Sequence, residues 1–136
     1  MLSIKTSDDE CIPMKRYNSR EYEAAERAMQ RTKSSLMDAI VDRDDAARKE
    51  VAVWGLEMEA KKALETIIEN EGYNSSACQL AHRELDRASI ATKKAIVDRD
   101  DAATREVDAW ALDMDAKNTF EIQVKKREER DSVERR

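Results

Sequence analysis

The sequence predicts an all-α protein made of two long antiparallel helices. Charged residues make up 40% of the 136-residue chain and aromatic residues only 4%, whereas glycine occurs twice and proline once. This composition suits long solvated helices and does not suit strands joined by turns. Residues Ala39–Glu65 recur at an offset of 56 as Ala95–Glu121, with 17 of 27 positions identical. We therefore expect one structural domain built from a tandem 56-residue repeat.

The first repeat, residues 17–72, is expected to form one helix. It begins with Tyr17-Asn18-Ser19, and Asn and Ser are favoured at helix N-termini because their side-chain oxygens accept hydrogen bonds from unpaired backbone NH groups. It ends at Gly72, the residue type expected just past a helix C-terminus, where a left-handed backbone is needed. No proline lies between these two signals, so the helix should be continuous.

The second repeat, residues 73–128, begins with a second copy of the same cap, Tyr73-Asn74-Ser75. The short connection around Gly72 should fold this helix back antiparallel to the first, so that facing residues have numbers that add to about 145. Outside the repeats, residues 1–16 are expected to form a flexible arm, and the charged tail, residues 129–136, is expected to fray.

Apolar residues near the 3.6-residue period predict the buried face of each helix. In the first helix these are Tyr22, Ala25, Met29, Leu36, Ile40, Ala47, Val51, Trp54, Met58 and Ile68, and in the second Ile96, Ala103, Val107, Trp110, Met114 and Val124. Steps of eleven residues recur among them, which predicts nearly straight or slightly right-handed packing. A second stripe is wider than a two-helix contact uses: Val41, Leu56, Ala63, Ile67, Val97 and Leu112. We therefore expect a homodimer that forms a four-helix bundle or coiled-coil assembly.

Two pairs of large side chains stand out as packing or interaction residues. Trp54 and Met58 are four residues apart, and Trp110 and Met114 repeat them in the second copy, so each pair shares one helix face. The favoured interpretation is packing in the core. The alternative is a pair of exposed anchors for a partner, because Trp and Met are enriched at protein interfaces.

The sequence Asp-Arg-Asp-Asp occurs at the same place in both repeats, at residues 42–45 and 98–101. In an antiparallel hairpin that turns at residues 72 and 73, the two segments should meet. Two reciprocal groups of salt bridges are expected to set the register: Arg43 with Asp100 and Asp101, and Arg99 with Asp44 and Asp45. Such pairs fix register more than they add net stability.

The same aspartates could instead bind a cation, but a bundle metal site needs Glu-x-x-His pairs, and the chain has one histidine, His82. No metal, cofactor or catalytic site is therefore expected, and Cys11 and Cys78 are interpreted as reduced thiols. The spacing of Glu23 with Glu26 and Asp42 with Asp45 resembles the carboxylate pairs of magnesium-dependent all-α nucleotide pyrophosphohydrolases. That resemblance would imply release of pyrophosphate from nucleotides. The sequence departs from the pattern because its second pair begins with Asp, and because the second copy replaces the first pair by Gln79 and His82.

Charge and hydropathy limit the kinds of partner and the location that we expect for this chain. The net charge of -5 is modest and mixed in sign, which argues against direct binding of nucleic acid. No apolar run approaches the length of a membrane span, and we expect a cytoplasmic protein. The leading hypothesis is a non-enzymatic, self-associating helical protein-interaction or scaffold module with another protein as its target. The alternative is a small acidic inhibitor, of the kind mobile elements carry, that mimics nucleic acid to block an enzyme.

Overall fold

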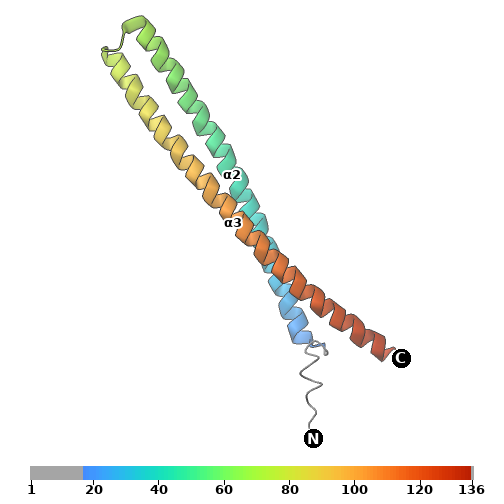
Figure 1. The fold of residues 1–136 in the computed structure, drawn as a ribbon. Helices are drawn as coiled ribbons and strands as arrows, with labels where there is room; N and C mark the ends of the chain where they lie inside the picture. The colour runs from blue at the N-terminus through green and yellow to red at the C-terminus, as the bar shows by residue number, and fades with distance from the viewer. Residues whose placement is uncertain (1–16, 136) are drawn as a thin grey trace. The chain divides into compact units, whose positions relative to one another are not determined.

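The computed structural model describes residues 17–135. It contains two α-helices, α2 from Ser19 to Glu71 and α3 from Ser76 to Glu134, packed against each other (Figure 1). The described residues contain no strand, so the prediction of an all-α fold with two long helices is confirmed. The predicted arm, residues 1–16 with Cys11, lies outside the described residues.

Helix α2 begins and ends at the signals expected from the sequence. The Asn18 side-chain oxygen accepts hydrogen bonds from the backbone NH groups of Arg20 at 2.9 Å and Glu21 at 3.4 Å, which satisfies two donors of the first turn. At the other end, Gly72 adopts φ +84°, and its NH donates to the Ile68 carbonyl at 2.9 Å. Glycine takes this left-handed conformation without the steric penalty of a side chain.

Helix α3 uses a different residue of the same cap motif. The Ser75 hydroxyl oxygen accepts a hydrogen bond from the Cys78 NH at 3.0 Å and donates to the Gly72 carbonyl at 3.3 Å, so the cap also ties the helix to the turn. Helix α3 continues to Glu134, and the tail that was expected to fray is therefore helical up to that residue. Arg136 lies outside the described residues.

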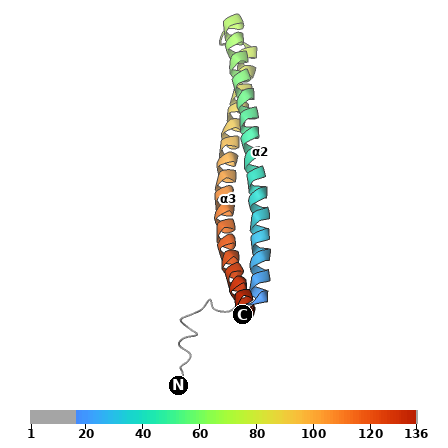
Figure 2. The same ribbon diagram turned by 90° about the vertical axis from the view of Figure 1, so that its right-hand side faces the viewer.

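The contacts divide the chain into two units, and each is described by itself. Unit 2, residues 37–108, contains the turn between the helices. Unit 1 combines the described residues of the ranges 1–36 and 109–136. Within unit 2, α2 and α3 run antiparallel beside each other on either side of the turn (Figures 1 and 2).

The interface between the two helices of unit 2, here called the seam, follows steps of three and four residues. Its members are buried or half-buried: Ala39, Arg43, Ala46, Glu50, Val53, Glu57, Ala60 and Leu64 of α2, and Ala81, Leu85, Ala88, Thr92, Ala95, Arg99, Ala102 and Glu106 of α3. These steps make a seven-residue period. The eleven-residue steps in the sequence, from which nearly straight or slightly right-handed packing was expected, therefore do not describe this seam.

A buried apolar cluster of unit 2 lies next to the turn. Leu64, Cys78 and Ala81 are buried there, with the half-buried Ile67, Ile68 and Leu85 packed against them. The Cys78 thiol is free and fully buried. Most of the remaining seam consists of alanine and charged residues, so the seam buries little apolar side-chain area per turn.

Two cross-helix contacts show the register. In unit 2 the Thr92 hydroxyl lies 3.5 Å from the Val53 carbonyl oxygen, and in unit 1 the Thr32 hydroxyl donates to the Asp113 carboxylate at 3.0 Å. In each pair the residue numbers add to 145, as the sequence predicts.

Unit 1 is held by aromatic and cationic side chains from both helices. The Tyr22 ring centroid lies 5.2 Å from that of Phe120 and 5.9 Å from that of Tyr17. The guanidinium groups of Arg127 and Arg130 lie over the rings of Tyr22 and Tyr17, at 5.1 and 4.4 Å from their centroids. Cation–π contacts of this kind add modestly to stability at exposed sites.

Candidate interaction site

Two reciprocal ion pairs cross the seam of unit 2. Arg43 Nε lies 2.7 Å from Glu106 Oε1, without the alignment of a hydrogen bond. Arg99 Nη1 donates to the Glu50 carboxylate at 3.0 Å. Residues 43 and 50 become residues 99 and 106 at the repeat offset of 56, so the two pairs are one interaction seen twice.

The carboxylates that meet the arginines across the seam differ from the expected ones. Asp44 and Asp100 contact the arginine of their own helix, at 3.2 Å from Arg43 and 3.1 Å from Arg99. The hydrogen bond to Asp100, together with the charge of Glu50, holds the pKa of Arg99 above its ordinary range.

The remaining two aspartates of the predicted salt bridges, Asp45 and Asp101, are exposed. The Asp45 carboxylate accepts a hydrogen bond from Arg48 of the same helix at 2.6 Å. Neither aspartate takes part in the ion pairs that cross the seam in the described residues.

The direction of helical side chains explains why glutamates are the partners. Each Cα–Cβ bond tilts toward the N-terminus of its own helix. In an antiparallel pair, Arg43 therefore leans toward higher residue numbers of α3, and Glu106 leans back toward Arg43. Asp100 and Asp101 lean away from it. The register was predicted correctly, but the partner lies one turn further along.

Glu50 and Glu106 are the seam residues that the sequence reasoning missed as salt-bridge partners. The signal was present, because Glu50-Val51 recurs as Glu106-Val107 within the repeat. A search for carboxylates one turn beyond the facing position would have found both.

The tryptophans are not part of the core in this chain. Trp54 and Trp110 are 55% and 57% exposed, and Met58 and Met114 are 36% and 42% exposed. The favoured interpretation of core packing does not hold for these side chains, whereas the exposed-anchor alternative fits their exposure.

The tryptophans were expected in the core because the buried face was traced through apolar residues, several of them at steps of eleven. The residues at steps of eleven start on the interface between the helices, at Met29 and Leu36, which are half-buried. Eleven is one heptad plus four, so the next steps reach Ile40, Ala47 and then Val51. These residues lie one position past the seam, on the neighbouring helix face.

That neighbouring face, here called the outer stripe, also follows steps of three and four residues. In the first repeat it contains Ile40, Asp44, Ala47, Val51, Trp54, Met58, Lys61 and Glu65, and in the second Ile96, Asp100, Ala103, Val107, Trp110, Met114, Lys117 and Glu121. All eight positions are identical in the two copies. Among the 27 aligned positions that begin at residue 39, five of the eight seam positions are identical in the two copies. Only four of the remaining eleven positions are identical.

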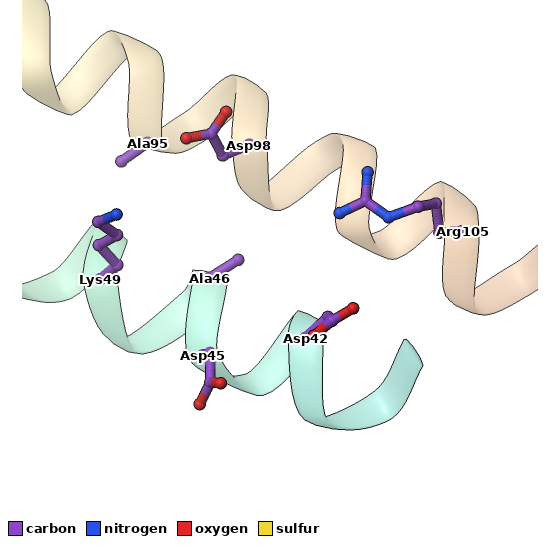
Figure 3. A pocket seen from close by; sticks show the side chains of 7 residues that line it. All are labelled: Asp42, Asp45, Ala46, Lys49, Ala95, Asp98 and Arg105. Carbon is purple, nitrogen blue, oxygen red and sulfur yellow. The ribbon is translucent and has the colours of Figure 1, made fainter. Parts of the chain in front are cut away.

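A different face of unit 2 carries mixed charge around a hollow of about 280 Å³ (Figure 3). Asp42 and Lys49 of α2 and Asp98 and Arg105 of α3 line it. Figure 3 shows Asp45 pointing away from α3, so the three carboxylates do not converge. In the described part of the chain, no three His, Cys, Asp or Glu side chains group as metal ligands.

Unit 1 contains a buried polar group that the repeat does not duplicate. Asp113 is 2% exposed, and its carboxylate accepts a hydrogen bond from Thr32 at 3.0 Å and contacts Lys117 Nζ at 3.1 Å. The interaction with Lys117, with a further contribution from Thr32, holds the pKa of Asp113 below its ordinary value of 3.8. At the repeat offset, Glu57 and Ala88 occupy the positions of Asp113 and Thr32.

Comparison with protein-family models, with curated proteins and with solved structures finds no match for this chain. Within residues 17–135, neither helix contains a stretch both long and apolar enough to cross a membrane.

Proposed function

We propose that this chain is a non-enzymatic, self-associating helical module that binds protein through its outer stripe. The observation that carries the proposal is the exposure of large apolar side chains beside a seam made mostly of alanine and charge. Val51 and Val107 are 69% and 66% exposed, and Trp54 is 55% exposed. Contiguous apolar surface of this kind marks interaction sites in proteins that remain soluble.

The helix geometry supports the same function. A helix with one apolar stripe buries that stripe against one neighbouring helix. A helix with two adjacent apolar stripes buries both only when it packs between two neighbouring helices. Each helix of unit 2 uses its seam for the other helix and keeps the outer stripe free. A coiled-coil homodimer of four helices gives each helix its second neighbour.

The tandem repeat gives this module two binding stripes in one chain. Duplication of a 56-residue segment explains the matching caps, the reciprocal ion pairs and the shared outer stripe in one step. Two linked copies of one binding surface raise the effective concentration of the second contact once the first has formed.

The test is the mass of the full chain by light scattering coupled to size exclusion, from about 1 µM to about 500 µM. We expect a mass near twice the 15.6 kDa of one chain, with a single-chain mass appearing only on dilution. A single-chain mass over the whole range contradicts self-association.

A further inference from the structure

The first observation is that the two repeats agree best along the outer stripe, whereas most of the other exposed positions between residues 39 and 65 differ between the copies. All eight outer-stripe positions are identical, whereas the seam, which packs within the chain, has lost identity at three of eight positions. Val53, Glu57 and Leu64 of the seam correspond to Ala109, Asp113 and Phe120 in the second repeat. An exposed surface with no contacts tolerates substitution better than a packed one. The outer stripe is therefore under a constraint that contacts within one chain do not supply.

The second observation is a local twofold axis in unit 2. The pairs Arg43–Glu106 and Arg99–Glu50 exchange under the repeat offset. Facing residue numbers add to 145, so the axis passes between residues 44–45 of α2 and residues 100–101 of α3, perpendicular to the plane of the two helix axes. A twofold rotation about this axis exchanges α2 and α3 but does not exchange the two broad faces of the helix pair. The outer stripes of α2 and α3 in this unit therefore share one side.

We propose that the occupant of this face is the same face of a second copy of the chain, with the α2 stripes of the two copies crossing at Ala47. This inference rests on the proposed self-association and names its surface. An isologous interface requires a patch that is complementary to itself after a twofold rotation. The outer stripe of unit 2 meets this requirement because Ile40, Asp44, Ala47 and Val51 of α2 recur on α3, in the opposite direction, as Ile96, Asp100, Ala103 and Val107.

The order of residue sizes fits antiparallel contact between two such stripes. Ala47 lies at the centre, and Ile40 and Trp54 lie seven residues to either side, which is about 10 Å along the helix. When the two α2 stripes cross antiparallel at Ala47, each Trp54 lies beside Ile40 of the other copy. The small central residues allow the helices to approach closely, and no tryptophan opposes another.

The charges also fit this arrangement. Asp44 and Asp100 belong to the outer stripe, and each is already paired with an arginine of its own helix, at 3.2 and 3.1 Å. The face around Asp42, Lys49, Asp98 and Arg105 stays in solvent. Once the two apolar faces cover each other, the outer surface is charged, so the assembly stops at two copies.

The experiment compares two double variants by light scattering and sedimentation equilibrium. Val51→Glu with Val107→Glu puts a charge in both outer stripes, whereas Leu56→Glu with Leu112→Glu is the matched control. The control leucines are also identical between the copies and are 60% and 61% exposed, but they lie outside the stripe. We expect the valine variant to weaken association by about 100-fold or more, as for loss of central interface contacts. We expect the leucine variant to stay within about threefold of the wild type.

A milder pair, Val51→Thr with Val107→Thr, keeps the side-chain shape and guards against loss of folding, which circular dichroism checks. It should weaken association by about tenfold with unchanged helix content. If the chain dimerises but the valine variants bind as tightly as the wild type, the dimer uses another surface and this inference fails alone. If Leu56→Glu with Leu112→Glu weakens association as much as Val51→Glu with Val107→Glu, the inference also fails. If the wild type has a single-chain mass at every concentration, self-association itself fails.

Discussion

The seam and the outer stripe are neighbouring faces of the same helices, yet they differ in composition, in packing and in identity between the repeats. The seam consists largely of alanine and paired charges and packs within the chain, whereas the outer stripe carries Val51, Trp54 and Met58 and is exposed. The repeats have diverged in the seam and are identical in the outer stripe. The difference teaches that apolar character alone does not show which face a helix buries against its nearest neighbour.

The largest effect should come from the apolar cluster beside the turn. Leu64→Ala removes a side chain that is 8% exposed and packs against Cys78 and Ala81. We expect the free energy of unfolding to fall by about 2–4 kcal/mol, from lost burial and the cavity left behind. Leu56→Ala, at a 60% exposed position, should change it by less than about 0.5 kcal/mol. Equal effects in urea unfolding would show that the seam does not hold the helices together.

The next effect concerns the reciprocal ion pairs. Arg43→Glu places two carboxylates together across the seam and should lower the free energy of unfolding by about 1 kcal/mol, a small value because the pair is partly exposed. Adding Glu106→Arg restores an opposite-charge pair and should recover most of the loss. The same exchange at Arg99 and Glu50 should behave alike, because the repeat makes the two pairs equivalent. A double variant as unstable as the single one would contradict the pairing.

Acid should act on unit 1 through Asp113. Its pKa is lower in the folded chain than the ordinary 3.8, so the folded state binds this proton less readily than the unfolded state. The stabilisation is complete above pH 3.8 and is lost as the pH falls from there through the folded pKa. Asp113→Asn should unfold several degrees below the wild type at pH 7, and the gap should narrow toward pH 2. A gap that stays constant in thermal melts would contradict this assignment.

The smallest effect should be that of salt on self-association. Each chain carries a net charge of -5, and an apolar interface between like-charged copies is favoured when salt screens their repulsion. Raising NaCl from about 50 to about 500 mM should tighten the dimer by up to about threefold. Sedimentation equilibrium at both salt concentrations checks this. A dimer that weakens tenfold in high salt would indicate a charged interface instead of the outer stripe.

Local signals in the sequence were sufficient for the helices and their register. Asn18, Ser75 and Gly72 cap and end the helices through hydrogen bonds or a left-handed backbone that depend on nearby residues alone. The position of the turn then sets which residues face each other.

The buried face could not be found from apolar periodicity. The seam residues Ala39, Arg43, Ala46 and Glu50 keep steps of three and four, but two of them are charged and two are small. Their role follows from packing between the helices and from the reach of long side chains toward the N-terminus of each helix. A comparison of the two repeats face by face would have singled out the outer stripe from the sequence alone.

The central claim is that the outer stripe is covered when two chains associate. Acrylamide quenching of Trp54 fluorescence, in a Trp110→Phe variant, tests it most directly when dilute and concentrated samples are compared alongside their masses. We predict that quenching is strong at the single-chain mass and falls severalfold as the mass doubles. A mass that doubles while Trp54 stays equally open to acrylamide would contradict the account.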